Sequence, residues 1–355
     1  MVWNGAEADE ILVATTGRIP QGALVLESDD GRVAVWRVPH DPGLPGLVTA
    51  TSPEPLHRLL DDLGVGAGDL HFRVAAYRPG RRAVVRVRRG TTVVFLKVVR
   101  PAAAETLHNC HKALRPTVPV PASLGFSAEL GLVALQGLPG TLLRRALGTP
   151  GTLPSPRTLV GFLDALPAAP ERAAPERAAI ASGWRVAEFT SLLARLRPRQ
   201  AEVLDRLAAE LTAVEDAVDE PSVPVHGDFH EAQLLVAGKA VCGVLDVDTF
   251  GSGRRLDDLA TMIGHISTLS LYSMRRRAVE AYGAQLLSAF DRSVDPVALR
   301  AAAAAVILGL ATGPFRVLED RWPDRTDERI RLAARWLDSA RRVAAGRRPA
   351  VAVAV

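Results

Sequence analysis

The chain has 355 residues, of which 48% are hydrophobic and 23% charged, with a formal net charge of +4. These values are ordinary for a globular protein with two or three compact units, and they exclude a fibrous or intrinsically disordered chain. Only two cysteines occur, so we expect no disulfide framework and a cytoplasmic location.

The charge is unevenly distributed along the chain. Residues 71–150 contain 13 Arg or Lys but only two acidic residues, a local net charge of +11. This excess is typical of a solvated arginine-rich surface, or of a positive field that favours a nucleotide polyphosphate. Nucleic acid is not favoured as a partner, because aromatic residues make up only 5% of the chain and no stacking motif accompanies the charge.

The N-terminal part predicts a small β structure followed by a helix. Residues 23–38 alternate between apolar and polar residues around an Asp-Gly turn, which indicates a hairpin. A helix is predicted to begin near Ser52, with Pro53 in its first turn. We interpret 1–66 as an N-terminal extension or subdomain.

Residues 67–138 predict a five-stranded antiparallel sheet with one helix. Three strand-like runs, "DLHFRVAAY", "RRAVVRVRR" and "TTVVFLKVV", are separated by short turns. A helix is predicted from Pro101 to Leu114, and two more strands are predicted near "ASLGF" and "GLVALQ".

From residue 139 to 345 the periodicity is mostly helical, so the fold class is α+β. The repeat "PERAAPERAA" within 167–179 predicts a low-complexity loop. The apolar run at 301–312 is too short to span a bilayer and predicts a buried helix, so no membrane partner is expected. We expect 346–355 to be a disordered tail.

The most informative segment is 226–260, "HGDFHEAQLLVAGKAVCGVLDVDTFGSGRRLDDLA". The runs "QLLV" and "VCGVLD" predict two strands joined by the turn "AGKA". An antiparallel hairpin brings its entrance and exit together. Asp228 and Asp246, 18 positions apart, can therefore share one site. Mg²⁺ prefers one or two carboxylates together with phosphate oxygens, so the pattern favours phosphoryl transfer.

This segment resembles the aminoglycoside phosphotransferase family, a branch of the protein-kinase-like fold. The resemblance rests on "HGD" at 226–228, Gln233, "LD" at 245–246 and "DLA" at 258–260. It extends over roughly 70–340 and implies two lobes, an antiparallel sheet with one helix at 67–138 and a mostly helical lobe at 139–345.

The resemblance also implies roles for these residues. Asp228 would be the catalytic base for the substrate hydroxyl. Asp246 would be the principal Mg²⁺ ligand and Gln233 the second ligand. His226 and Asp258 would support the loop from behind.

The upstream half implies the nucleotide site. Lys97 occupies the place of the lysine that binds the ATP phosphates, and Glu105 that of its ion-pair partner. The segment "ALQGLPG" resembles the interlobe linker, which would receive the adenine through backbone groups around Gln136 and Leu138. Residues 77–87, "YRPGRRAVVRV", occupy the nucleotide-loop position but are not glycine-rich.

Two departures from the family pattern stand out. Gln233 replaces the usual Asn, as in relatives similar to the maltokinase branch. Its side chain has one more methylene, which moves the amide oxygen, and Mg²⁺ is strict about the positions of its ligands. Arg254 and Arg255 stand where Asp-Pro is common, and neither is expected to touch the metal.

The expected function is that of an ATP- and Mg²⁺-dependent kinase acting on a hydroxyl of a small molecule, such as an amino-sugar antibiotic, a sugar or an amino alcohol. The alternative, motivated by Gln233, is a pseudokinase that binds nucleotide or ligand without turnover. The net positive charge of the chain disfavours polycationic aminoglycosides as substrates. The oligomeric state is left open.

Overall fold

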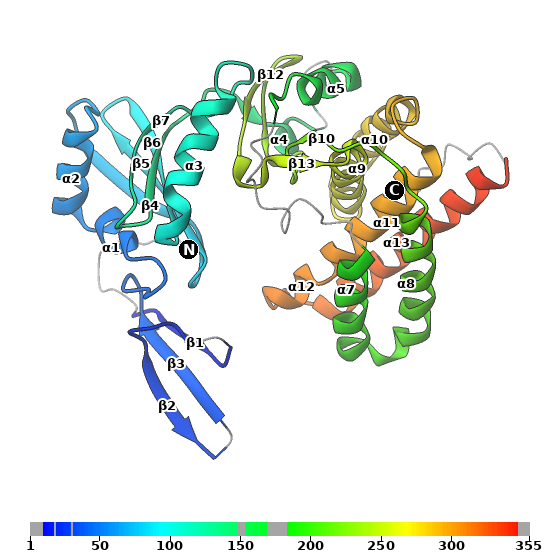
Figure 1. Cartoon of the computed structure of the whole chain (residues 1–355), viewed down its shortest axis with the longest axis horizontal. Coiled ribbons are helices and arrows are strands. Elements are labelled where there is room, and N and C mark those ends of the chain that lie inside the picture. The colour runs from blue at the N-terminus through cyan, green and yellow to red at the C-terminus, as the bar shows by residue number, and fades with distance from the viewer. Residues whose placement is uncertain are drawn as a thin grey trace. The chain divides into compact units, whose positions relative to one another are not determined.

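The computed structural model divides into two compact units (Figure 1). Unit 1 comprises Met1–Pro116 and Val120–Leu138, and unit 2 comprises Thr117–Pro119 and Pro139–Val355. The structure describes residues 10–17, 19–29, 31–147, 149, 153–168 and 183–346. The predicted tail, apart from Gly346, and most of the predicted low-complexity loop lie outside these residues.

Unit 1 begins with a three-stranded antiparallel sheet in the order β1-β3-β2. Its strands are β1 (Leu12–Thr15), β2 (Leu24–Ser28) and β3 (Gly31–Arg37). The hairpin predicted at 23–38 is confirmed as β2 and β3, which pair from Leu24 opposite Val35 to Ser28 opposite Gly31. Strand β1 was not predicted from the sequence.

The main sheet of unit 1 has five antiparallel strands, as predicted, and the structure gives their order as β4-β5-β6-β8-β7. The strands are β4 (Leu70–Arg78), β5 (Arg82–Arg89), β6 (Thr92–Val99), β7 (Ser123–Ser127) and β8 (Leu132–Gln136). Helix α3 (Pro101–Leu114) has the predicted bounds, because proline fits the first turn, where its missing N–H costs no hydrogen bond.

Both faces of this sheet are covered (Figure 1). Helices α1 (Gly46–Thr51) and α2 (Pro53–Asp62) pack on one face, and α3 packs on the other. Because side chains alternate along a strand, β6 sends Leu96 toward α1 and α2 and sends Phe95 toward α3. The predicted extension 1–66 therefore contributes residues to the hydrophobic core of the sheet.

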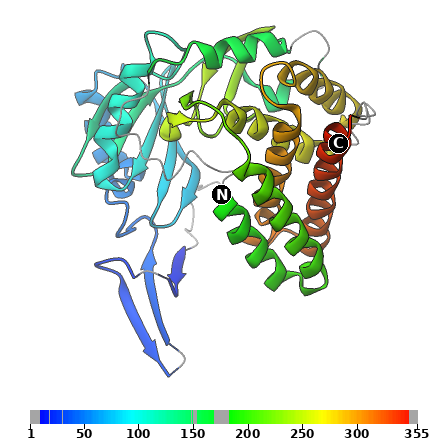
Figure 2. The same cartoon turned by 45° about the vertical axis from the view of Figure 1, so that its right-hand side comes forward.

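Unit 2 is mostly helical (Figures 1 and 2). Its helices are α4 (Leu143–Ala146), α5 (Pro156–Asp164), α7 (Gly183–Leu196), α8 (Ala201–Asp216), α9 (Arg255–Ser270), α10 (Arg276–Phe290), α11 (Pro296–Ala311), α12 (Gly313–Arg316) and α13 (Trp322–Ala344). Among the described residues one stretch, Pro296–Arg316, is long and apolar enough to cross a membrane, but 72% of its most apolar window is buried inside the fold. It contains the helix predicted to be buried.

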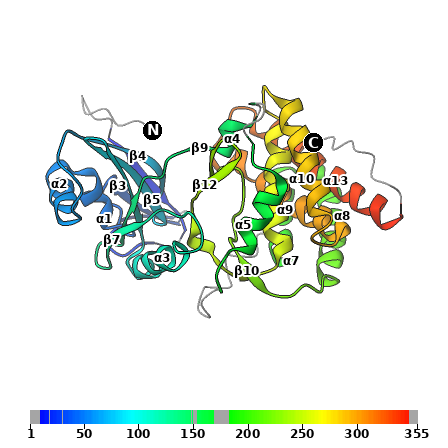
Figure 3. The same ribbon diagram turned by 90° about the horizontal axis from the view of Figure 1, so that it is seen from above.

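Two small sheets in unit 2 include strands of the segment 226–260 (Figure 3). One has the order β12-β11-β9, with β9 (Thr141–Leu142), β11 (Leu234–Ala237) and β12 (Ala240–Val244). The other pairs β10 (Val223–Val225) with β13 (Gly251–Gly253). The predicted hairpin is confirmed as β11 and β12, whereas the very short strands β9, β10 and β13 were not predicted.

The shared core gives a prediction for α2. Leu60 is fully buried against the sheet, so Leu60→Ala should destabilise unit 1 by about 2–5 kcal/mol through lost burial and a residual cavity. Hydrogen exchange of the β5 and β6 amides measures this loss of protection. Leu59→Ala, at a partly buried neighbour, is the control and should cost less. Unchanged β5 and β6 exchange in Leu60→Ala would show that 1–66 folds independently of the sheet.

Candidate active site

The β11–β12 hairpin brings Gln233 and Asp246 together at its open end. Leu234 pairs with Val244, and the N–H of Leu245 donates to the carbonyl of Gln233 at 2.8 Å. The side-chain amide of Gln233 then lies 3.5 Å from Oδ2 of Asp246. The expected meeting of the entrance and the exit of the hairpin is therefore present in the structure.

Asp246 has an uncommon backbone conformation. Its φ and ψ are 55° and 51°, in the left-handed region, between β12 and the one-turn 3₁₀ helix Val247–Thr249. Asp is one of the few non-glycine residues that enter this region readily. The chain turns sharply at this residue, which ends β12 with a carboxylate at the hairpin mouth.

The loop at 226–228 is held from behind by Asp258, in the first turn of α9. The two carboxylate oxygens of Asp258 accept the N–H of His226 at 2.7 Å and the N–H of Gly227 at 2.8 Å. Burial raises the pKa of Asp258, while His226 and the two amide hydrogen bonds oppose that rise. The predicted supporting position of Asp258 matches these contacts.

His226 links the loop to the end of β12. Its Nε2 lies 2.9 Å from the carbonyl oxygen of Leu245, and its Nδ1 accepts the N–H of Asp228 at 3.2 Å. A carbonyl can only accept, so Nε2 carries the proton and Nδ1 offers the lone pair. One imidazole ring thereby fixes the backbone of Asp228 relative to the residue that precedes Asp246.

Gly227 is required by its surroundings. Its φ is +80°, and a Cβ atom there would lie 2.6 Å from the carbonyl oxygen of Thr249. The pairing of β10 with β13 causes this close approach, because it sets Val225 opposite Gly251. The Thr249 hydroxyl also donates to the carbonyl of His226 at 2.9 Å.

A chain of contacts connects Asp228 with the hairpin mouth through His230. Nε2 of His230 lies 3.7 Å from Oδ1 of Asp228 and 3.3 Å from the amide nitrogen of Gln233. Burial alone would raise the pKa of Asp228, but the contact with His230 and the nearby histidines lower it overall. Burial opposes the charge on His230, yet Asp228 and Glu231 raise its pKa to about 9.

Two further residues complete this cluster and were not singled out from the sequence. Glu231 is buried, with Oε2 3.6 Å from Nδ1 of His230 and 3.7 Å from Nδ1 of His265. The rings of His230 and His265 stack at 3.9 Å, and burial lowers the pKa of His265 to about 4. The available signal was helical spacing, since His265 follows Asp258 by two turns on α9.

The hydrogen bonds of His230 test whether the hairpin mouth fits a metal ion. Nδ1 of His230 receives the N–H of Ala232 at 3.2 Å, so Nε2 of the neutral ring carries the proton, as it also does in the charged ring. If the amide nitrogen of Gln233 faces Nε2 of His230, two N–H donors face each other. If the amide is turned so that its oxygen faces Nε2, this oxygen accepts a hydrogen bond from His230 but lies close to a carboxylate oxygen of Asp246.

A cation between the two oxygens removes this conflict. The end of the Gln233 amide lies 3.5 Å from Oδ2 of Asp246, so the two side chains are near enough to be ligands of one ion. The donor set is an amide oxygen and a carboxylate, both hard ligands suited to Mg²⁺. Gln233 and Asp246 therefore fit the predicted metal, and His230 fixes the orientation of the amide.

A second possible metal group among the described residues does not fit. Asp228, His230 and His265 offer ligand atoms that all lie within 4.8 Å of one another. The two rings, however, are inclined by only 11° and stacked. The in-plane lone pairs of stacked rings run nearly parallel, so they do not converge on one ion.

In unit 1 the structure places Lys97 on β6 with 6% of its surface exposed. Strand alternation puts it on the same face as Phe95 and Val99, the face that α3 covers. Glu105 lies on α3, directly after the core-facing Ala104, and is exposed. The pairing of Lys97 with Glu105 stays a prediction.

The predicted linker, residues 134–140, begins within the last residues of β8 and continues beyond it. The N–H of Gln136 donates to the carbonyl of Ala122 at 2.8 Å, and the N–H of Gly137 donates to Val93 at 2.9 Å. Both donors are therefore committed within the protein. The nucleotide contacts assigned to Gln136 and Leu138 stay a prediction.

Arg254 and Arg255 have structural partners. Arg254 donates to Asp257 and to Glu215 at 2.9–3.1 Å, and Arg255 donates to the carbonyl of Leu163 at 3.0 Å. These contacts tie both arginines to other parts of unit 2.

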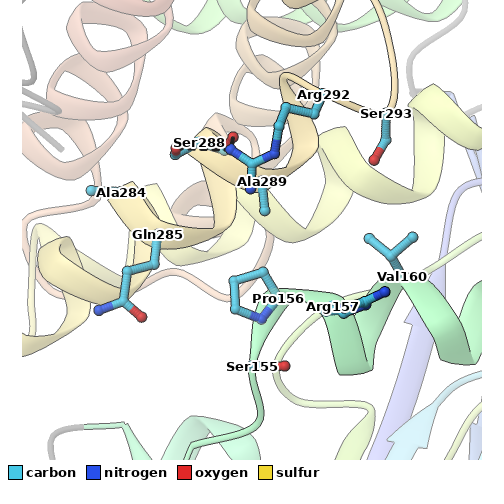
Figure 4. Close-up of a pocket in the computed structure, with 10 residues that line it drawn as sticks. All are labelled: Ser155, Pro156, Arg157, Val160, Ala284, Gln285, Ser288, Ala289, Arg292 and Ser293. Carbon is cyan, nitrogen blue, oxygen red and sulfur yellow. Dashed lines mark hydrogen bonds between the residues drawn. The ribbon is translucent and has the colours of Figure 1, made fainter.

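A hollow of about 800 Å³ in unit 2 lies apart from the predicted residues. It lies between the start of α5 and the end of α10 (Figure 4). Its lining consists of Ser155, Pro156, Arg157, Val160, Ala284, Gln285, Ser288, Ala289, Arg292 and Ser293. Because it contains none of the predicted site residues, the site is assigned to the hairpin mouth and its loop.

Comparison with known proteins agrees with the fold and the motif. The model of the phosphotransferase enzyme family matches residues 73–300. No curated protein is significantly similar to the chain in sequence.

Several solved structures share the fold. A thermostable mutant of the aminoglycoside phosphotransferase APH(4)-Ia, in ternary complex with ADP and hygromycin B, matches with a TM-score of 0.54 at 16% identity, over 79% of this chain and 97% of that chain. The gentamicin complex of APH(2")-IIa matches with 0.54 at 11% identity, over 79% and 96%. The GDP complex of aminoglycoside 2'-phosphotransferase-IIIa matches with 0.53 at 12% identity, over 79% and 98%. These matches confirm the predicted α+β, protein-kinase-like fold.

The contact between Asp258 and the loop gives a prediction. Asp258→Asn replaces one acceptor oxygen by a donor that faces an amide N–H. We expect the His226 and Gly227 amides to exchange with solvent about 10- to 100-fold faster, because a buried donor loses its partner. Hydrogen exchange followed by NMR measures these rates.

Asp257→Asn is the matched control. It makes the same substitution one residue away, where the carboxylate pairs with Arg254 instead of with the loop. Its loop amides should keep the wild-type rates. Equal acceleration in the two variants would contradict a specific role of Asp258 in holding the loop.

Proposed function

The chain belongs to the phosphotransferase enzyme family, and we propose that it uses ATP and Mg²⁺ to phosphorylate a hydroxyl group of a small molecule. The family match over 73–300 confirms the resemblance seen in the "HGD" segment. The observation that carries the proposal is the hairpin mouth, where Gln233 meets Asp246 and connects through His230 to Asp228.

Asp228 is the proposed catalytic base. It accepts a hydrogen bond from the substrate hydroxyl and orients the hydroxyl oxygen toward the γ-phosphorus of ATP. As the new O–P bond forms and the bond to the β–γ bridging oxygen breaks, the hydroxyl proton passes to Asp228. Its lowered pKa keeps the carboxylate ionised at neutral pH. A weak base is sufficient, because in the loose transition state of phosphoryl transfer the attacking hydroxyl has lost little of its proton.

The metal and nucleotide are assigned to the remaining residues. Gln233 and Asp246 would hold Mg²⁺, which neutralises charge on the phosphates when bound. Lys97 would hold the phosphates from β6, with Glu105 as its partner. Backbone groups around Gln136 and Leu138 would receive the adenine.

The charges of unit 2 bear on the acceptor. The acidic residues at 319–328 could attract a polycationic substrate electrostatically, but arginines pair with several of them. Asp327 pairs with Arg197 at 2.5 Å, and Glu319 pairs with Arg325 at 3.4 Å. Hygromycin B and gentamicin appear in the structures of the compared enzymes. For this chain the neutralised acidic segment favours a sugar or an amino alcohol over a polycationic antibiotic.

The assignment of Asp228 predicts the effect of its removal. Asp228→Ala should lower turnover by about 10²–10⁴-fold, the usual contribution of a positioned base, and leave nucleotide binding unchanged. Phosphorus NMR with a panel of sugars, amino alcohols and aminoglycosides detects the phosphorylated product. Asp216→Ala, at an exposed position on α8, is the control. Wild-type turnover in Asp228→Ala would remove this residue from its role, and nucleotide binding without any product in the wild type would favour a module without turnover.

The assignment of Gln233 predicts a metal effect. Gln233→Ala should raise the Mg²⁺ concentration for half-maximal activity by about 10- to 100-fold, because one ligand and its hydrogen bond to His230 are lost. Electron paramagnetic resonance of Mn²⁺ in the presence of ADP measures the same loss without turnover. Gln285→Ala, on α10, should behave as the wild type. Equal Mn²⁺ affinity in all three proteins would exclude Gln233 as a ligand.

A further inference from the structure

Asp41 in unit 1 is a buried carboxylate that the proposed reaction does not use. Only 2% of its surface is exposed, and it accepts three hydrogen bonds. Oδ1 accepts the N–H of Gly43 at 2.8 Å, and Oδ2 accepts the Tyr77 hydroxyl at 2.8 Å and the N–H of Gly80 at 2.7 Å. A buried charge needs such partners, so these three bonds fix the position of the side chain.

Tyr77 extends this arrangement to β3. Its hydroxyl donates to Asp41 and accepts the indole N–H of Trp36 at 3.3 Å. Burial raises the pKa of Tyr77, so the phenol stays protonated and remains a donor. Trp36, Tyr77 and Asp41 thus form one continuous hydrogen-bonded line from the N-terminal sheet to the main sheet.

The line ends on the turn between β4 and β5. In this turn the N–H of Arg81 donates to the carbonyl of Arg78 at 3.0 Å, and Gly80 has φ +64°. Pro79 followed by a glycine with positive φ is the signature of a type II turn. The N–H of Gly80 points at Asp41, and so is not free to bind a phosphate.

The backbone of the N-terminal segment also touches this turn. A Cβ atom on Gly43 would lie 3.0 Å from Cα of Gly80 and 3.1 Å from its carbonyl oxygen, so the two glycines are in direct backbone contact. On the far side of the segment, Leu44 is fully buried in the core of the sheet. Residues 41–44 are therefore anchored in the core and lie against the turn.

The β4–β5 turn occupies the position of the nucleotide loop, and it carries Arg81 and Arg82 directly after Gly80. We propose that Asp41 and Tyr77 are positioning residues that fix this turn for the phosphates of the nucleotide, so that the N-terminal segment sets nucleotide affinity without touching the nucleotide. This inference rests on the proposed function.

Two substitutions test it with limited disturbance. Asp41→Asn keeps the size of the side chain but removes one oxygen acceptor, and Tyr77→Phe removes only the hydroxyl. We expect each to raise the dissociation constant of Mg·ADP, measured by calorimetry on the full chain, and the KM for ATP by about ten-fold. The value of kcat and the KM for the acceptor should not change, because the catalytic loop lies in unit 2.

Asp61→Asn is the matched control. Asp61 also pairs with β5, through Arg89 at 2.7 Å, but at the opposite end of the strand from the turn. It should leave the affinity for Mg·ADP unchanged. Thermal unfolding of the variants separates a general loss of stability from a change in affinity.

Each outcome decides between the two proposals. Unchanged Mg·ADP affinity in Asp41→Asn, or tighter binding, overturns the positioning role and leaves the proposed function intact. Equal weakening in Asp61→Asn assigns the effect to stability and also overturns it. A wild-type chain that binds no Mg·ADP overturns the proposed function and this inference together.

Discussion

The arrangement of the candidate site depends on one buried carboxylate, that of Asp258. Removing a carboxylate from water is expensive unless donors replace the lost hydration, and here the backbone amides of His226 and Gly227 supply them. Because the carboxylate is carried by a helix packed in the core, the loop takes its position from the core of unit 2. Gly227 then has to be a glycine, and His226 has to link Asp228 to the end of β12.

In unit 1, too, a buried carboxylate holds a loop by accepting a backbone N–H group. Asp41 is another short, buried carboxylate, and it accepts the N–H of Gly80 from the β4–β5 turn. In both units the segment so held is a loop, which has no ladder of backbone hydrogen bonds of its own to fix it. Loops carry most binding and catalytic groups but gain their order from the scaffold behind them. A carboxylate suits this task because it accepts several donors at once and is short enough to be held by its own backbone.

The sequence predicted those parts whose signal is local. Alternation in "RRAVVRVRR" and "TTVVFLKVV" predicted two strands, which are observed as β5 and β6, and Pro101 marked the start of α3. The predicted hairpin implied that its entrance, with Asp228, and its exit, with Asp246, meet in one site, because antiparallel pairing brings the two ends of a hairpin together. The contact observed at its open end joins Gln233 to Asp246. Strands β9, β10 and β13 have only two or three residues, too few to show a period. The contacts of Asp41 with Tyr77 and Gly80 span 36 and 39 positions and follow no repeat, so no local pattern revealed them.

The replacement of Asn by Gln at position 233 shows how a departure from a motif can be accommodated. The longer side chain has one more rotatable bond, so holding its amide in one place costs additional conformational entropy. His230 supplies a compensating constraint, because its Nε2 bears a proton in either charge state and can donate only to the oxygen of the amide. That end is the one a metal requires. The charge on His230 is in turn favoured by Asp228 and Glu231, the residues on its two sides. The position of the Gln233 amide is therefore explained by its contact with His230, three residues before it.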